Sequence, residues 1–530
     1  MGNSAARLAY FLACVLAGLL AAGSPLRAEA PLSAIDWLTR SAPVPVVQQP
    51  KQRSQPAPAR KAPAAPEAPV ARSAARPDVT VVPLGAPSAD AAGLLAPRVT
   101  GLPATLWRGS RSDDLIALLA RARVEAFPAM QALMYTLLLA EAEPPEGSGP
   151  EARFLQARID ALLGMGAVEP ALAMLDPIAT THPALFARWF DLTLLAGEED
   201  RACAALIDAP SLAPGWDARI YCLARRGDWQ TAALTFATAR SLGMLGRTEE
   251  AMLEHFLDPE LFEGEPLPQP PVRPTVLLFR LYEAMGEPLP TAPLPRAFSV
   301  ADLRDTAGWK AQIEAAERLA RGGALSENRL VALYTERMPA ASGGVWDRTE
   351  AIQRFDAALA AGDPGSVAVA LPGVWSVVAA ARLEDAFARA YAPALLRLPL
   401  TGGAADLAYR IGLLSPDYEA AAQARGAAFP GLVFETGIAR GAPPPASPGD
   451  ETAAAIAAAF GGAEPPQDIR TAIAAGRLGE AILLAMQRFQ TGAAGEPVAL
   501  REALAAFRAL GLEDTARRAA LQVRLLRRGL

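Results

Sequence analysis

Side chains that commonly act in catalysis or bind metal ions are scarce in this chain, which has two histidines and three cysteines among 530 residues. His182 precedes Pro183 at an expected helix start, and His255 lies in an apolar stretch of expected helix. A histidine in either setting is more often structural than catalytic. We therefore predict no catalytic histidine, no cofactor and no metal site.

Cys203 and Cys222 remain when the N-terminal segment that contains Cys14 is removed by export. They fall on consecutive expected helices, and neighbouring antiparallel helices can bring such a pair within bonding distance. An even number of cysteines in an exported chain favours a disulfide, which here would contribute on the order of 3 kcal/mol. Two cysteines this far apart lack the partner ligands of a metal site. We predict a Cys203–Cys222 disulfide.

The familiar catalytic motifs are missing from the sequence. It contains no Gly-x-Ser-x-Gly elbow, no Gly-x-x-x-x-Gly-Lys-Ser/Thr phosphate loop and no His-Glu-x-x-His zinc pair. Two carboxylates at the right separation would suffice for a glycosidase. However, the acidic runs at 198–200 and 249–250 are typical of solvated helix starts. We predict that the protein is not an enzyme.

Composition indicates a helical protein without affinity for nucleic acid. Hydrophobic residues make up 52% of the chain, and Ala and Leu dominate them, which favours helix over strand. The formal net charge is −6, so no overall electrostatic attraction to DNA or RNA is expected. We predict no nucleic-acid partner.

The first residues have the order of a secretory signal peptide: Arg7 precedes an apolar run over 8–22, and a small-residue segment ends at Ala28. We predict that 1–28 is a signal peptide, cleaved at or near Ala28. The run has about 15 residues, whereas roughly 20 are needed to span a bilayer. Later Leu/Ala-rich stretches are interrupted by charges, Gly or Pro. The mature chain is therefore expected to be exported, with no transmembrane span, and the periplasm is its expected compartment.

An isolated apolar cluster follows the predicted cleavage site. Ile35, Trp37 and Leu38 lie within residues 29–41, separate from any segment with apolar periodicity. Short apolar anchors of this kind commonly dock into a groove of a partner protein. We predict a partner-docking motif, and the alternative is that the segment folds back onto the helical body.

Residues 42–104 are rich in Pro, Ala, Val and Gln and show no apolar periodicity. Such a segment buries too little apolar surface to repay its ordering entropy. We predict a disordered Pro-rich linker. Its scattered Lys and Arg side chains could make weak contact with anionic envelope polymers or lipid, and a solubilising role is the simpler interpretation.

Three glycines, each after a Leu/Ala-rich helical segment, are followed five residues later by an alanine: the pairs are Gly166 with Ala171, Gly197 with Ala202, and Gly227 with Ala232. The glycine spacings of 31 and 30 residues resemble the period of about 34 residues in tetratricopeptide (TPR) repeats. We predict an all-α fold, arranged as an irregular α-solenoid of TPR-like helix pairs after the linker. Separate helical bundles are the alternative.

Proline-rich interruptions divide the expected helical body. TPR-like repeats are predicted at 105–262, a helical region at 275–440, and C-terminal helical repeats with a cap at 450–530. The arginine-rich last helix, 515–528, is expected to be the cap, with a surface for anionic lipid as the alternative. Trp229, Trp346 and Trp375 are expected to be buried in repeat packing.

Several segments bear a resemblance to known sequences: Ile35-Asp36-Trp37-Leu38, residues 220–223 with Gly227-Asp228-Trp229, and residues 333–337 leading into 343–348. In these segments the chain resembles uncharacterised exported alphaproteobacterial helical-repeat proteins, some of which are labelled as related to antifreeze glycopeptide. The resemblance implies export and a shared architecture, and it implies no activity. The sequence has neither a regular array of Thr nor an Ala-Ala-Thr repeat, so ice binding is not expected.

These observations predict a non-enzymatic periplasmic scaffold for protein–protein interaction, with envelope proteins as partners. The alternative is an accessory factor or enzyme of cell-wall metabolism whose acidic residues come together only in the folded chain. Two acids that face one groove would favour the alternative, whereas an apolar surface would favour the scaffold.

Overall fold

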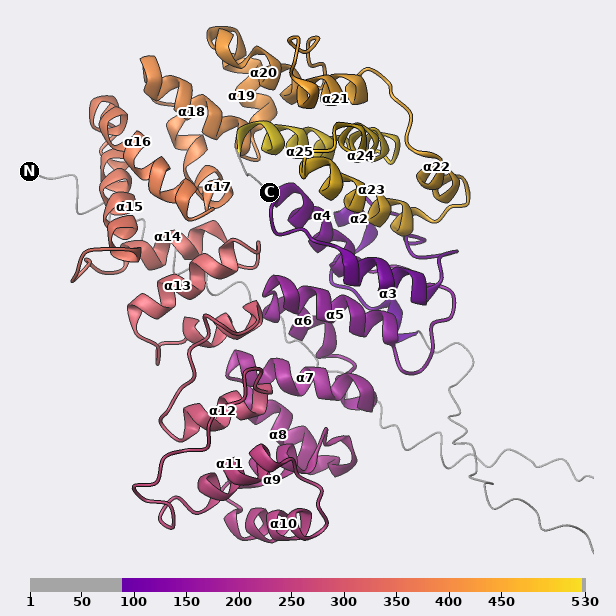
Figure 1. Ribbon diagram of the computed structural model, residues 1–530, viewed down its shortest axis with the longest axis vertical. Helices are drawn as coiled ribbons and strands as arrows, with labels where there is room; N and C mark the ends of the chain where they lie inside the picture. The colour runs from indigo at the N-terminus through magenta and orange to yellow at the C-terminus, as the bar shows by residue number, and fades with distance from the viewer. Residues whose placement is uncertain (1–87, 527–530) are drawn as a thin grey trace, which may run out of the picture. The chain divides into compact units, whose positions relative to one another are not determined.

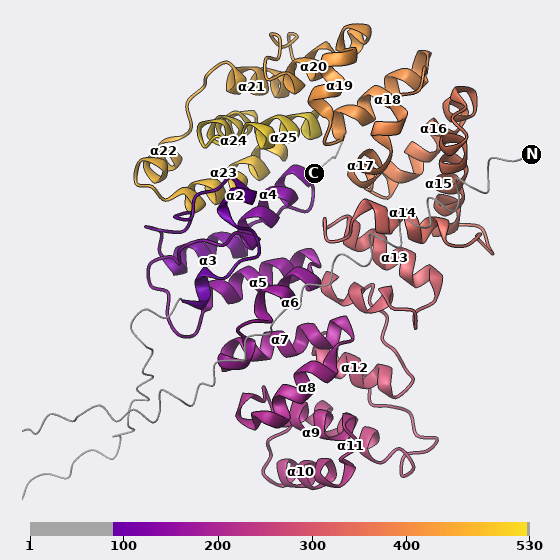
Figure 2. The same ribbon diagram turned by 180° about the vertical axis from the view of Figure 1, so that it is seen from behind.

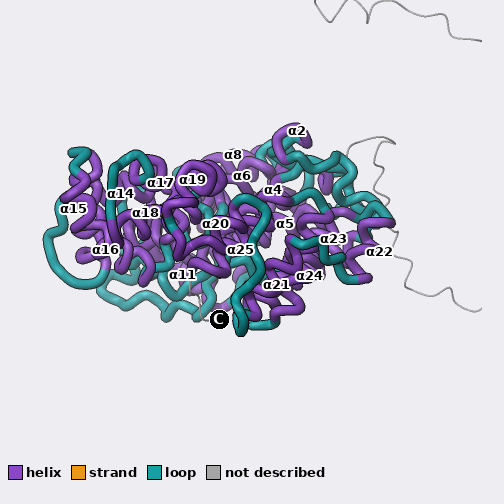
Figure 3. The backbone as a smooth tube through the Cα atoms, turned by 90° about the horizontal axis from the view of Figure 1, so that it is seen from above, coloured by secondary structure: helices purple, strands orange, loops and turns teal. Residues whose placement is uncertain are grey.

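The computed structural model describes residues 88–526, which form a helical body (Figure 1). No strand occurs in that range, where extended pairing is confined to two isolated bridges, Leu95 with Ala140 and Arg111 with Glu146. A view from above shows helices and connecting loops throughout the described part (Figure 3). The all-α class predicted from the sequence is confirmed.

The α-helices of the described residues are α2 (Pro97–Thr100), α3 (Ser112–Arg121), α4 (Pro128–Leu139), α5 (Arg153–Met165), α6 (Val168–Leu175), α7 (Pro183–Ala196), α8 (Glu199–Asp208), α9 (Trp216–Arg225), α10 (Trp229–Ser241), α11 (Arg247–Leu257), α12 (Val276–Ala284), α13 (Trp309–Ala320), α14 (Glu327–Thr335), α15 (Val345–Ala360), α16 (Pro364–Ala380), α17 (Glu384–Leu395), α18 (Gly402–Leu414), α19 (Tyr418–Arg425), α20 (Val433–Ala439), α21 (Glu451–Phe460), α22 (Gln467–Ala474), α23 (Leu478–Ala493), α24 (Pro497–Ala509) and α25 (Glu513–Leu525). The 3-10 helices are η1 (Ala89–Ala91), η2 (Ala179–Thr181), η3 (Pro210–Leu212), η4 (Arg296–Leu303), η5 (Gly426–Ala428) and η6 (Pro430–Leu432).

Helix pairs in the first half of the body turn at the glycines that the sequence singles out. Gly166 ends α5 and Gly197 ends α7, with φ of 88° and 79°. Only a residue without Cβ adopts this conformation at little cost. The amide of each glycine donates hydrogen bonds to carbonyls in the last turn of the helix that it ends. Ala171 and Ala202 are fully buried, so the following helix approaches closely. The helix-turn pattern is present, and its assignment to the TPR type stays a prediction.

Helices far apart in sequence also pack together (Figures 1 and 2). The helix α12 returns beside α7, and η4 contacts α5, α7 and α13. At the two ends of the described chain, α23 contacts α3 and α25 contacts α4. The buried Oε1 atom of Gln522 accepts a hydrogen bond of 2.9 Å from the Ala129 amide. In a simple solenoid each pair contacts only its neighbours, so these contacts go beyond that pattern, and the solenoid arrangement stays a prediction.

The close approach of the two ends depends on a glycine. Trp107 is fully buried, and a Cβ at Gly479 on α23 would lie 2.4 Å from its ring. Real Cβ atoms essentially never approach other atoms that closely, so only glycine lets α23 pack against Trp107. A large apolar cluster runs from α3 to α12 and also includes residues of α18 to α25, while a second cluster lies among α13 to α18.

Residues 88–104 differ from the disordered linker predicted over 42–104, because they fold against α4 and α5. Asp90 is buried, and its Oδ1 atom accepts a hydrogen bond of 2.8 Å from the Leu155 amide. The buried Arg158 donates hydrogen bonds to the carbonyls of Asp90 and Ala92. Each of these hydrogen bonds has a backbone atom as one partner, and such bonds cannot be recognised from the spacing of apolar residues in the sequence. The linker prediction is therefore wrong for its last residues, and 42–87 lie outside the described residues.

The N-terminal predictions concern residues that the structure does not describe. The signal peptide at 1–28 and the docking motif of Ile35, Trp37 and Leu38 both lie outside the described residues. Among the helices of residues 88–526, none combines the length and the apolarity that a membrane crossing requires.

The arginine-rich last helix lies among other helices, since α25 contacts α4, α18, α20 and α24. Arg524 forms ion pairs with Glu435 at 3.1 Å and with Asp450 at 2.7 Å. Arg517 pairs with Glu513 at 2.9 Å, and Leu521 is fully buried. Arg517 and Arg524 are thus paired within the body, whereas Arg527 and Arg528 lie outside the described residues, and the alternative of a lipid-binding surface stays untested.

Candidate functional site

The segment from α8 to α11, residues 199–257, projects at one end of the described body, and we call it the distal arm (Figure 1). A disulfide between Cys203 on α8 and Cys222 on α9 fixes its first two helices, with an Sγ–Sγ distance of 1.99 Å and a Cα–Cα distance of 4.9 Å. Both cysteines are buried. The disulfide predicted from the sequence is confirmed, and it makes the base of the arm rigid.

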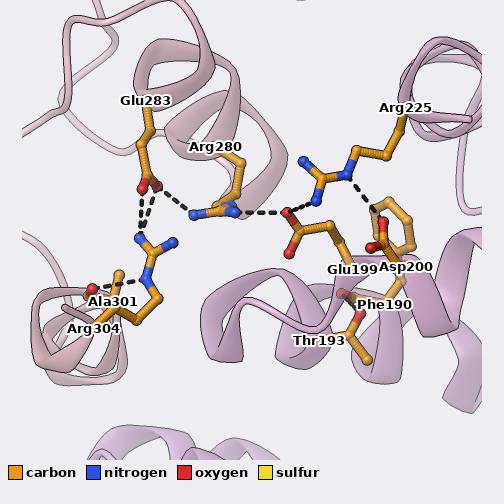
Figure 4. Close-up of polar contacts among 9 residues, drawn as sticks. All are labelled: Phe190, Thr193, Glu199, Asp200, Arg225, Arg280, Glu283, Ala301 and Arg304. Carbon is orange, nitrogen blue, oxygen red and sulfur yellow. Dashed lines mark hydrogen bonds and ion pairs between the residues drawn. The ribbon is translucent and has the colours of Figure 1, made fainter. Parts of the chain in front are cut away.

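A chain of ion pairs connects the distal arm to the rest of the body (Figure 4). Glu199 on α8 accepts a hydrogen bond of 2.7 Å from Arg280 on α12, and it lies 3.4 Å from Arg225 on α9. Arg225 also pairs with Asp200 at 3.0 Å. The side chains of Glu199 and Arg280 are only 2% and 9% exposed. The sequence-based view of Glu199 as a solvated helix start is wrong, because α12 covers it.

The same chain of ion pairs continues beyond α12 (Figure 4). Arg280 also pairs with Glu283, whose two carboxylate oxygens accept hydrogen bonds of 2.7 and 2.8 Å from Arg304. Burial opposes the charge of Arg280, but Glu199 and Glu283 outweigh that effect and raise its pKa. Buried charges that pair with one another in this way hold α8 and α12 in a fixed relative position.

The outer face of α10 is unusual for the edge of a helical body, since its residues are exposed and uncharged: Gln230, Thr231, Leu234, Ala237, Thr238, Ser241 and Leu242. Leu234 is 69% exposed and Leu242 is 63% exposed. The opposite face packs on α9 and α11 through Ala232, Phe236 and Ala239. Terminal helices of helical arrays normally present a polar outer face. We call this surface the α10 outer face.

One charged residue on α10 lies at the margin of this face. Arg240 forms ion pairs with Glu250 at 2.9 Å and with Glu254 at 2.7 Å, both on α11. Trp229, at the start of the helix, is 48% exposed and packs against the ring of Phe256. The expectation that Trp229 is buried is wrong, because no further helix covers α10 among the described residues.

A groove of about 650 Å³ adjoins the α10 outer face, and we call it the distal groove. Its lining combines the turn before α9 with the loop between α10 and α11, namely Pro210, Ala213, Pro214, Gly215, Trp216, Asp217, Arg219, Met244, Leu245, Gly246 and Glu249. The guanidinium group of Arg219 lies 5.8 Å from the centre of the Trp216 ring. The exposed Met244 joins the groove to the apolar residues of α10.

Two acids in the distal groove lie against the starts of their own helices. An oxygen of Asp217 would lie 2.3 Å from a Cβ at Gly215, and an oxygen of Glu249 would lie 2.2 Å from one at Gly246. Gly215 and Gly246 are the N-cap residues of α9 and α11, where carboxylates complement the helix dipole. Their first role is therefore to stabilise helix ends, as the sequence predicts for Glu249.

Burial and the charge of Glu249 raise the pKa of Asp217, against the opposing effect of the Ala218 amide. Burial raises the pKa of Asp191 on α7 to about 6, and the charge of Asp217 acts in the same direction. Within the described part of the chain, no group of three His, Cys, Asp or Glu side chains is placed to hold a metal ion.

The raised pKa of Asp191 predicts a stability that depends on pH. A carboxyl whose pKa is higher in the folded state stabilises that state while protonated, so its contribution is lost as pH rises from about 4 to above 6. Asp191→Asn is expected to raise the free energy of unfolding at pH 7 by about 1 to 2 kcal/mol, and to leave it nearly unchanged at pH 4. Urea unfolding at both pH values measures this difference. The exposed Asp406→Asn is the control, and an equal gain from both variants would contradict the assignment.

The two histidines contact groups close to them in the chain. The Nδ1 atom of His255 lies 2.8 Å from the Ala251 carbonyl, and its ring stacks on Phe262 with the ring centres 4.0 Å apart. His182 begins α7, and its Nδ1 atom lies 2.9 Å from the Thr181 hydroxyl.

Only some of the residues predicted from the sequence lie in the distal arm. Cys203 and Cys222 lie within the distal arm, whereas Ile35, Trp37 and Leu38 lie outside the described residues. The sequence gives no direct sign of the α10 outer face, although its low charge is visible between residues 229 and 242. Comparisons with protein-family models, with curated proteins and with solved structures give no match for this chain.

Proposed function

We propose that this protein is a non-enzymatic, exported scaffold that binds a partner protein through the α10 outer face and the adjoining distal groove. The observation that supports it most directly is the exposure of Leu234 and Leu242 on an uncharged helix face at the edge of the body. Apolar groups exposed together in this way mark protein interaction sites more often than isolated ones do. The periplasm and its envelope proteins are the proposed compartment and partners.

The distal arm has the rigidity that such a binding surface requires. The Cys203–Cys222 disulfide and the buried Glu199–Arg280 pair hold its base in one position. A preorganised surface loses less conformational entropy on binding. The disulfide also supports export, because such bonds persist mainly in oxidising compartments.

A second candidate function is favoured by one specific observation, the presence of Asp217 and Glu249 in a single groove beside Trp216. An accessory enzyme of cell-wall metabolism would use two such acids on a polysaccharide. Their contacts with the N-cap glycines favour the structural role, so we propose the scaffold first. If the purified wild-type protein cleaves cell-wall polysaccharide and the Asp217→Asn variant does not, the enzyme becomes the preferred function.

Site-specific crosslinking in living cells tests the scaffold. A photoreactive phenylalanine analogue is introduced at Leu234 or Leu242, and at Val369 on α16 as a matched control that is also apolar and exposed. A discrete adduct from both α10 positions, absent from Val369, is expected. Adducts of equal yield from all three positions, or from none, would contradict the proposal.

A further inference from the structure

A loop rich in acidic side chains follows the distal arm at the end of α11, and we call residues 258–265 the acidic loop. Between residues 248 and 272 the chain has seven acidic residues and no Lys or Arg. Glu250 and Glu254 pair with Arg240 on α10. Leu261, inside the loop, is 67% exposed. The four acids of the loop are exposed and have no ion-pair partner among residues 88–526: Asp258, Glu260, Glu263 and Glu265.

Aromatic contacts place the acidic loop near the start of α10. The ring of Trp229, the first residue of α10, has its centre 5.8 Å from that of Phe256 on α11. The acidic loop begins two residues after Phe256, and its Phe262 stacks on His255 with the ring centres 4.0 Å apart. Near the other end of α10, Glu249 lines the distal groove. Acidic side chains therefore lie toward both ends of the α10 outer face.

The arginines of this region do not balance its acids. Six arginines and no lysine occur between residues 199 and 265. Three of the arginines pair with neighbouring acids, so three have no ion-pair partner among the described residues. The surface around the α10 outer face thus carries a net negative charge. Eight acids of the same range lack such a partner in the described part of the chain, namely Asp208, Asp217, Asp228, Glu249 and the four acids of the acidic loop.

The α10 outer face is less polar than its hydroxyl groups suggest. The Thr238 hydroxyl donates a hydrogen bond of 2.8 Å to the Leu234 carbonyl, and the Ser241 hydroxyl donates one of 2.9 Å to the Thr238 carbonyl. Both donors are therefore used within the helix. Thr231, Leu234, Thr238 and Leu242 follow one another at three or four residues, so they form one stripe about 17 Å long. A stripe of this spacing is the contact surface that one helix offers to another.

We propose that the partner of the α10 outer face is an amphipathic helix whose apolar stripe is bordered by Lys and Arg. Its apolar side chains pack on Leu234 and Leu242, and its cations lie against the acidic loop and Glu249. This inference rests on the proposed function and adds the chemistry of the partner. The same charges disfavour a second copy of the chain or an anionic lipid surface, because either would bring like charges together.

Binding of two synthetic peptides to the purified chain, with its disulfide intact, tests the proposal by fluorescence anisotropy. One peptide of Leu and Lys is patterned as an amphipathic helix, and the other has Glu in place of each Lys. The Lys peptide is expected to bind at least about tenfold more tightly than the Glu peptide. The double variant Leu234→Ser with Leu242→Ser is expected to lower the affinity for the Lys peptide about tenfold.

Neutralising the acidic loop separates the effect of charge from that of apolar contact. The variant carries Asp258→Asn, Glu260→Gln, Glu263→Gln and Glu265→Gln. It is expected to bind the Lys peptide about tenfold more weakly at low ionic strength and like the wild type at high ionic strength, where the charges are screened. A matched control neutralises four other exposed acids that lack ion-pair partners among the described residues, and it should keep the wild-type affinity at both ionic strengths: Glu151→Gln, Asp406→Asn, Glu451→Gln and Glu496→Gln.

The adduct formed in living cells by the photoreactive analogue at Leu234 distinguishes failure of this inference from failure of the proposed function. Its yield is expected to fall in the acidic-loop variant and to persist in the control variant. An adduct of equal yield in both variants, or equal binding of the two peptides, would overturn this inference and leave the proposed function in place. Absence of any adduct with the acids intact would overturn both. A dimer of the chain that Leu234→Ser with Leu242→Ser abolishes would show that the occupant is a second copy.

Discussion

Replacing Glu199 by alanine is expected to lower the free energy of unfolding by about 3 kcal/mol. The carboxylate is 2% exposed and pairs with Arg280, which is itself 9% exposed. Its removal leaves the guanidinium group buried with Glu283 as its remaining carboxylate partner. The guanidinium group then has one carboxylate where it had two, and a poorly compensated buried charge is among the few causes of so large a loss. Urea unfolding followed by tryptophan fluorescence measures it.

A neighbouring acid provides the matched control for this result. Asp200 pairs with Arg225 at 3.0 Å, but its side chain is 77% exposed. An exposed ion pair contributes little, so Asp200→Ala is expected to cost no more than about 0.5 kcal/mol beyond any change in helix propensity. The double variant Glu199→Leu with Arg280→Met removes both buried charges and is expected to lose less than Glu199→Ala alone. Equal losses from Glu199→Ala and Asp200→Ala would contradict a buried joint.

Local features of the helical body could be predicted from the sequence because they depend on neighbouring residues. Gly166 and Gly197 end their helices through a positive φ that the glycine itself permits. Cys203 and Cys222 meet because consecutive helices in this region are antiparallel neighbours. In each case the determining contact lies within about one helix pair, the range over which apolar periodicity and turn residues give information.

Features that depend on distant segments could not be predicted in the same way. Gln522 meets the Ala129 amide across 393 residues, and Glu199 is buried by Arg280 across 81 residues. A glutamate at a helix start is ordinarily solvated, and nothing near Glu199 in the sequence indicates that α12 will cover it. The α10 outer face is the reverse case, because a helix face without charged side chains has no further helix over it among residues 88–526. The burial of Glu199 and the exposure of the α10 outer face both depend on which helices pack together. The spacing of apolar residues along the chain does not determine that.

Replacing Arg158 by methionine is expected to lower the free energy of unfolding by about 4 kcal/mol or more. The guanidinium group is fully buried and donates hydrogen bonds to four carbonyls, those of Leu138, Ala140, Asp90 and Ala92, at 2.6 to 3.3 Å. Methionine is of similar length and would leave all four acceptors buried without a donor. Each such acceptor costs about 1 to 3 kcal/mol, and relief of the buried charge offsets only part of that sum.

The loss should be concentrated where Arg158 joins separate segments. Burial lowers the pKa of Arg158 to about 10, partly countered by Asp90, so the group remains protonated and able to donate at neutral pH. In Arg158→Met, hydrogen exchange is expected to accelerate first at residues 88–95, which that side chain holds to α5. Arg153→Met, on the same helix but exposed and paired with Asp113 at 3.0 Å, should change stability by no more than about 0.5 kcal/mol. A variant at Arg158 that exchanges like the wild type over 88–95 would show that the Leu155 amide and Asp90 alone suffice to hold this segment.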